Sequence, residues 1–133
     1  MGSFTNFSES RMLRHELGIA AQSFPGTLYL ALFSATPSDT GGGTELAGSG
    51  YARQPITFAE AGQIATNTAL IVFPDATADW VQATHWGVFD ASTGGNLKPY
   101  GRLETSGGAA NPQTVLTGNH LEFAIGSVAV SLD

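Results

Sequence analysis

Residues 84–103 constrain the fold more than any other stretch, because they have the pattern of a β-hairpin. Two alternating runs flank a turn in which Asp90 can hydrogen-bond the backbone ahead of it. Gly94 and Gly95 can adopt a positive φ there without a Cβ clash. The second arm is expected to present one shared face made of Leu97, Pro99, Gly101 and Leu103. This slim arm faces the large Trp86 of the first arm, which suits a sheet that packs on a core.

Residues 27–33 form a second informative run, because they are apolar on both faces of the alternation. Such a run predicts a strand that is covered on both sides. A helix is predicted just before it, within residues 1–24: Asn6 can cap the helix, and Leu13 and Leu17 share a face. A helix of about three or four turns is not stable alone in water. We therefore expect it to cover the outer face of the strand at 27–33.

Residues 36–50 have neither helical nor strand periodicity and are rich in glycine, serine and threonine. This composition predicts a long exposed loop. Its glycines do not match a phosphate-binding loop, because the Gly-x-x-x-x-Gly-Lys-Ser/Thr pattern is absent. A loop of this length in a small domain usually has a function, so we interpret it as a contact loop or a flexible linker.

Further alternating or apolar runs predict strands at residues 55–59, 65–73, 114–117, 120–125 and 127–132. About eight strands at regular spacing predict one mainly β domain, an antiparallel β-sandwich of jelly-roll type with one N-terminal α-helix. The whole chain of 133 residues is expected to form this domain. The side chains predicted to fill the core are Leu30, Phe58, Val72, Trp86, Val88, Leu103, Phe123 and Val130.

Composition excludes several classes of protein. The formal net charge is -6 and the few basic residues are scattered, which argues against nucleic-acid binding. The chain has no cysteine, so it can form neither a disulfide nor a thiolate metal site. No apolar run approaches the roughly 20 residues of a membrane span. Because only 12% of the residues are charged, the surface favours permanent assembly with other proteins.

Motifs of catalysis and metal binding are absent from the sequence, including Gly-x-Ser-x-Gly and His-Glu-x-x-His. We interpret His85 and His120 as strand side chains, because a catalytic base also needs an orienting partner. We interpret Asp90 as a turn cap rather than a calcium ligand. The expectation is therefore a protein without enzymatic activity, cofactor or metal.

A carbohydrate- or receptor-binding module is the alternative, because aromatic side chains can stack on sugar rings. The candidates for such stacking are Tyr51, Trp80, Trp86 and Tyr100. Trp86 belongs to an alternating strand, which favours a position in the core. Binding to a glycan array would distinguish this module from a purely structural subunit.

Several short segments, in this order and spacing, resemble a family of small tailed-bacteriophage virion proteins, whose members are commonly labelled tail fibre proteins. The segments are LYLALF at 28–33, TP at 36–37, GYARQ at 50–54, TN at 66–67, FP at 73–74 and GVFDA…GGNL at 87–97. The resemblance implies a structural, non-enzymatic subunit of the virion that is made in the cytoplasm of the bacterial host. It implies partners among the major capsid or tail proteins, with the subunit acting as a head decoration (cement) protein or a tail or fibre accessory.

The surface that attaches this subunit is expected in the two segments that a sandwich does not itself require. These are the N-terminal segment and the loop at 36–50, with contacts predicted at Phe4, Phe7, Gly41, Gly42 and Gly43. Low charge lets apolar and small polar contacts associate at little desolvation cost. Because repeated subunits usually form closed symmetric assemblies, we expect a homo-oligomer.

Overall fold

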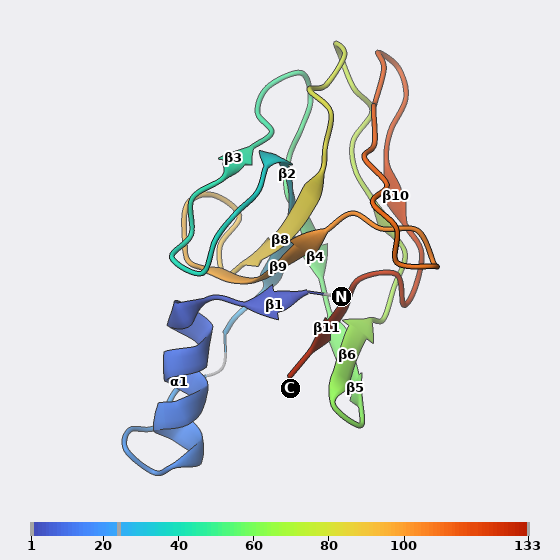
Figure 1. Ribbon diagram of the computed structural model, residues 1–133. Coiled ribbons are helices and arrows are strands. Elements are labelled where there is room, and N and C mark those ends of the chain that lie inside the picture. The colour runs from blue at the N-terminus through green and yellow to red at the C-terminus, as the bar shows by residue number, and fades with distance from the viewer. Residues whose placement is uncertain (1, 24, 133) are drawn as a thin grey trace.

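The computed structural model describes residues 2–23 and 25–132, and the fold is mainly β, as predicted (Figure 1). Every pair of named strands is antiparallel. The elements are β1 (Ser3–Phe4), α1 (Asn6–Glu16), β2 (Leu28–Ala35), β3 (Thr44–Glu45), β4 (Gln54–Ile56), β5 (Phe58–Ala61), β6 (Ile64–Asn67), β7 (Ile71–Val72), β8 (His85–Phe89), β9 (Leu97–Arg102), β10 (Glu122–Phe123) and β11 (Ala129–Ser131). No helix in these ranges is long and apolar enough to cross a membrane.

The predicted hairpin is present as β8 and β9, and it belongs to a six-stranded sheet in which β1-β9-β8-β2-β3 are neighbours in this order and β4 also pairs with β2. The turn has the predicted chemistry. Asp90 Oδ1 accepts a hydrogen bond of 2.7 Å from the backbone N–H of Asn96, and Gly94 and Gly95 have φ values of 60° and 76°. On the core side, Gly101 gives Trp86 room, because a Cβ at position 101 would lie 2.8 Å from the indole ring.

One expectation about the hairpin was wrong: Leu97 does not share a face with Gly101 and Leu103. The register shifts between the pairs Gly87↔Tyr100 and Phe89↔Leu97, so β9 carries one extra residue. The bulge turns Leu97 to the opposite side of the sheet, where it is buried. Alternation alone cannot show such a bulge, because each face is assigned on the assumption of unbroken pairing.

Strand β2 is covered on both faces, as predicted, but not by the helix. The outer face carries Ala31 and Phe33, which are buried against Leu97, with Phe89 and Tyr100 packed around them. Helix α1 contacts β1 and β9 instead. The bulge in β9 supplies the cover that we had assigned to the helix, which leaves α1 projecting from one corner of the molecule (Figure 1).

The main core lies between the six-stranded sheet and two smaller sheets, β11-β6-β5 and β10-β7. The pairing of β7 with β10 continues beyond these two strands: residues 71–83 run antiparallel to residues 113–123 through bonds such as Phe73 N–H to Leu121 O and Trp80 N–H to Val115 O, at 3.0 and 2.9 Å. Of the strands predicted at 114–117 and 120–125, only Glu122–Phe123 is a regular strand, β10, and residues 114–117 form none. The arrangement is an antiparallel sandwich, and its jelly-roll connectivity stays a prediction.

Most of the predicted core residues face this space. Those that are buried are Leu30, Trp86, Val88, Leu103 and Val130, and those that are half-buried against them are Phe58 and Phe123. The prediction for Val72 was wrong, because its side chain is 43% exposed while Ile71 and Phe73 are buried. The predicted strand at 65–73 is broken at residues 68–70 into β6 and β7, so the alternation loses its phase there.

The stretch 36–50 is more structured than the predicted exposed loop. It contains β3, which pairs with β2, and it inserts Leu46 into the main core. Gly43 has a φ of 75°, and a Cβ there would lie 2.9 Å from the backbone oxygen of Ala35. Gly41 and Gly42 also have positive φ but face open space. Exposed residues occur along the whole stretch, interrupted by the buried Pro37 and Leu46.

Candidate assembly surface

Helix α1 begins one residue earlier than predicted, because Thr5 rather than Asn6 is the N-cap. The Thr5 hydroxyl donates a hydrogen bond of 2.6 Å to the backbone oxygen of Leu97 and so ties the helix start to β9. The Asn6 N–H donates a 2.9 Å bond to the backbone oxygen of Asp39. This bond joins the helix to the glycine-containing loop. Two segments that were predicted separately as contacts therefore lie side by side.

The predicted contact residues fall into three places. Phe7, Gly41 and Gly42 line one shallow hollow, and Phe7 is 38% exposed, with the Lys98 ammonium 5.3 Å from its ring centroid. Phe4 is part of β1, half-buried, and packs on the main core. Gly43 lies close to the backbone of Ala35 on β2 and does not line this hollow. Only three of the five residues therefore share one surface.

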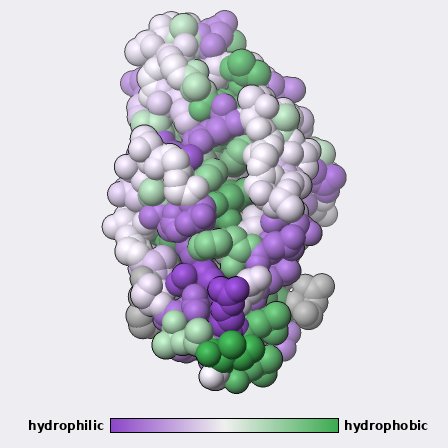
Figure 2. Space-filling model, turned by 90° about the vertical axis from the view of Figure 1, so that its left-hand side faces the viewer, coloured by the Kyte–Doolittle hydropathy of each residue, from purple (hydrophilic) through white to green (hydrophobic). Residues whose placement is uncertain are grey.

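The C-terminal part of α1 and the turn that follows it expose an apolar surface whose residues are not among the predicted contacts. Leu13, Leu17 and Ile19 are 59%, 69% and 70% exposed. Figure 2 shows apolar surface gathered at the lower end of the molecule, where α1 lies in Figure 1. Apolar side chains concentrated on a projecting helix are typical of a protein interface rather than of a free surface.

A groove starts between α1 and the sandwich and continues along the sandwich beyond the helix, and we call it the α1 groove. It consists of two adjoining hollows of about 330 and 450 Å³ that share the walls Phe4, Ala65 and Val130. Ser8 lines the first hollow from α1, and Lys98 lines it from β9. The groove thus joins the N-terminal segment to the sheet that carries the C-terminal strand β11.

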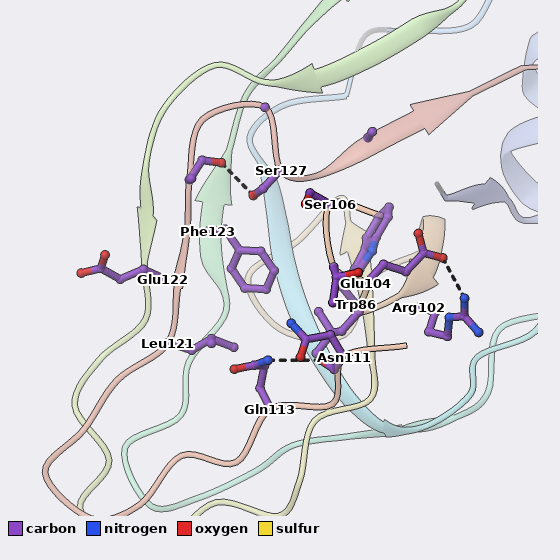
Figure 3. Close-up of a pocket in the computed structure, with 15 residues that line it drawn as sticks. Trp86, Arg102, Glu104, Ser106, Asn111, Gln113, Leu121, Glu122, Phe123 and Ser127 are labelled. Carbon is purple, nitrogen blue, oxygen red and sulfur yellow. Dashed lines mark hydrogen bonds and ion pairs between the residues drawn. The ribbon is translucent and has the colours of Figure 1, made fainter. Parts of the chain in front are cut away.

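A larger cleft of about 600 Å³ lies on another side, and we call it the Trp86 cleft (Figure 3). Leu121 and Phe123 line one side of it, and Trp86 and Glu104 line the other. The Trp80 indole N–H donates to the backbone oxygen of Ser49 at 2.8 Å, whereas the Trp86 indole has no hydrogen bond within the described ranges. The cleft combines apolar walls with polar side chains, as ligand sites commonly do.

The aromatic side chains proposed for sugar stacking do not form an exposed platform. Trp80 and Trp86 are buried, and Tyr51 packs edge-on against Trp80. Burial and the hydrogen bond to Glu45 raise the pKa of Tyr51. The Tyr100 hydroxyl donates a 2.6 Å bond to Asp39, and this bond, with burial, raises the pKa of Tyr100 to about 12. These four residues are structural in this fold.

Of the two histidines interpreted as strand side chains, His85 is one, whereas His120 lies outside the strands, two residues before β10. His85 lies on β8, and burial, with the charge of Arg102, lowers its pKa. His120 lies between two carboxylates, 2.9 Å from Glu122 and 3.0 Å from Asp75, which raise its pKa in that order. Within the described part of the chain, no group of three His, Asp or Glu residues could hold a metal ion.

Asp90 serves the hairpin turn. Burial alone would raise the pKa of Asp90, but two hydrogen bonds from Asn96, with the charge of Lys98, hold it below its ordinary value. Both carboxylate oxygens are therefore engaged by the turn itself. This geometry supports the interpretation of Asp90 as a cap.

A buried charged cluster fixes the same turn, and sequence reasoning missed it. Arg53 binds both carboxylate oxygens of Glu45, at 2.9 and 2.8 Å, and donates to the backbone oxygens of Ala91 and Gly94. Its guanidinium lies 3.7 Å from the centroid of the Phe89 ring. Burial alone would raise the pKa of Glu45, but the bond from Arg53 keeps it low. No sequence signal links these residues, because the fold alone brings them together.

Fold and surface together define a small antiparallel β domain with one projecting, partly apolar helix. Residues 3–131 match the family described as podophage GP4 fiber I protein gp80. The chain belongs to this family of phage virion fibre proteins, which confirms the resemblance seen in the sequence. No match is found among curated proteins.

Proposed function

We propose that the chain is a non-enzymatic structural subunit of the virion that docks on another fibre or particle protein through α1. The exposed apolar side chains of Leu13, Leu17 and Ile19 carry this proposal. A helix of 11 residues is marginal alone in water, and here only Ser8 is buried, with Arg11 and Met12 half-buried. A partner that covers the apolar side chains would stabilise the helix and remove their surface from water.

The family description favours a fibre accessory over a head decoration protein. The hollow shared by Phe7, Gly41 and Gly42 adjoins the start of α1, so it forms the second part of the proposed docking surface. A homo-oligomer that uses the same surface remains part of the proposal, since symmetric contacts are common among repeated virion subunits. No catalytic step is assigned to the chain.

Incorporation into particles tests this function. A phage that lacks the gene would be grown in hosts that supply either the native subunit or a variant with Leu13→Ser, Leu17→Ser and Ile19→Ser. The matched control replaces Val81 and Ile125 with Ser, because both are 68% exposed elsewhere on the surface. We expect the helix variant to remain folded but to be depleted from purified particles, as measured by quantitative mass spectrometry. Normal incorporation of the helix variant, or equal depletion of the control, would contradict docking through α1.

Carbohydrate or receptor binding is the second candidate function, and the Trp86 cleft supports it. Its volume of about 600 Å³ suits a small ligand. Asn111 lines it and offers an amide that can both donate and accept hydrogen bonds. Saturable binding to host surface polysaccharide that is lost in Asn111→Ala, but kept in Gln82→Ala outside the cleft, would support this function. Equal binding by both variants would place the ligand elsewhere.

A further inference from the structure

We propose that the α1 groove binds an extended segment of another virion protein, and that this segment is apolar and acidic. The inference rests on the proposed docking function and names the chemistry of the partner. Three observations support it: the apolar floor of the groove, a buried hydroxyl without a partner, and cations at one end of the groove.

The floor of the groove is apolar and continuous. Phe4 and Val130 line both hollows, and Met12 of α1 lines the first. Side chains of an extended segment point to the same side at every second residue. Successive inward side chains can therefore fill the two hollows in turn. This alternation favours an extended segment as the occupant of two adjoining hollows.

Ser8 gives the groove a polar group that lacks a partner. Its side chain is 5% exposed, and its Oγ is the enclosed side-chain atom without a hydrogen bond among the described residues. Buried hydroxyl groups are normally paired, so an unpaired one at the wall of a groove indicates a missing partner. Rotation about χ1 of Ser8 lets this hydroxyl donate to a backbone or side-chain oxygen of the bound segment.

The charges of the groove are asymmetric. Arg11 and Lys98 line the first hollow, which has no carboxylate among its described lining residues, whereas Glu60 lines the second. Lys98 forms no direct ion pair within the described ranges. Burial lowers the pKa of Lys98, and the neighbouring charge of Arg11 lowers it further, with Asp90 opposing both. A carboxylate of the bound segment would pair with these cations at the α1 end.

The test uses the intact protein and an array of overlapping synthetic peptides that tile the structural proteins of the same virion. Met12 provides the readout, because it lines the groove and is one of only two methionines in the chain. Protein labelled with ¹³C at the methionine methyl groups would be titrated with each peptide that binds. The Met12 signal would be assigned by its loss in Met12→Leu.

We expect binding peptides to be apolar and acidic and to shift the Met12 methyl signal. Lys98→Met should weaken their binding about tenfold, which is typical of losing one partner of a partly desolvated charge pair. The same substitution should not weaken binding of peptides in which Asp and Glu are replaced by Asn and Gln. Arg14→Met is the matched control, because Arg14 lies on α1 but lines neither hollow, and it should change little. Ser8→Ala should also weaken binding.

Several outcomes would overturn the inference. They are the absence of any binding peptide, binding that leaves the Met12 signal unchanged, and a preference for basic peptides. A Met12 signal that moves with protein concentration alone would identify a second copy as the occupant, which also overturns it. If no peptide binds while the Leu13, Leu17 and Ile19 variant is still depleted from particles, docking through α1 stands and only the groove assignment fails.

Discussion

Replacing Ser8 with alanine should stabilise the free protein, although the same change is expected to weaken partner binding. An enclosed hydroxyl without a hydrogen bond costs about 1–3 kcal/mol, and Ser8 Oγ is such a group. Alanine also favours the helix interior over serine by about 0.5 kcal/mol. The cavity left by one oxygen atom is small. We therefore expect the free energy of unfolding to rise by about 1–3 kcal/mol in Ser8→Ala.

Ser10→Ala is the control for this measurement, because Ser10 is exposed on the same helix. It should give only the helix-propensity gain of about 0.5 kcal/mol. Equilibrium urea unfolding reports the global change, and hydrogen exchange of the α1 amides reports it even when the helix opens before the sheets. The difference between the two variants isolates the cost of the unpaired hydroxyl.

The reasoning fails if Ser8→Ala is no more stable than Ser10→Ala. That result would mean that the Ser8 hydroxyl is already paired in the free protein. The α1 groove would then lose the unsatisfied donor on which part of its assignment depends. A gain in stability together with weaker peptide binding is the combination expected of a polar group kept for a partner, because a purely structural serine would not affect binding.

Three further predictions follow from the sandwich. Ile71→Ala should lower the free energy of unfolding by about 2–5 kcal/mol, whereas Val72→Ala should cost well under half of that, because only Ile71 is buried; urea unfolding measures both. Gly101→Ala should cost about 1–3 kcal/mol and shift tryptophan emission, since its Cβ would press on the buried indole. NMR titration should place the pKa of His120 above 6.5 and the pKa of His85 below 6.5. Protonated His120 should therefore add to the free energy of unfolding in full below pH 6.5, and this contribution should be lost as the pH rises through the pKa of His120 in the folded protein.

Local chemistry decided which parts of the fold could be predicted. The turn at Asp90, Gly94 and Gly95 was predictable, because the required φ values and the capping bond arise within a few residues. The bulge in β9 was not, because it depends on pairing with both β1 and β8. The prediction for Val72 failed for the same reason. The face of the sheet on which Val72 lies depends on the break between β6 and β7, which tertiary contacts impose.

In the candidate site, too, the features that depend on local sequence were predictable and those that depend on tertiary contacts were not. Phe7, Gly41 and Gly42 could be selected because a sandwich has no need of them, and they do line one hollow. The α1 groove could not be predicted, because Ser8 and Lys98 are far apart in the sequence and neither is unusual in its own segment. Their meeting follows from the bond between the Thr5 N–H and the backbone oxygen of Lys98, which only the folded chain shows.

The uneven distribution of Lys and Arg residues over the molecule supports the assignment of the α1 end as the docking surface. The chain has five Lys and Arg residues against eleven Asp and Glu. Arg53 is enclosed in the cluster with Glu45, while Arg11, Arg14 and Lys98 lie on or beside α1. In a protein with a net charge of -6, three of the five cations thus gather where apolar side chains are also most exposed. Glu9 and Glu16 balance the two arginines along α1, so the attraction for an acidic segment is local to the first hollow, which Arg11 and Lys98 line, and it acts over about 8–10 Å at physiological salt.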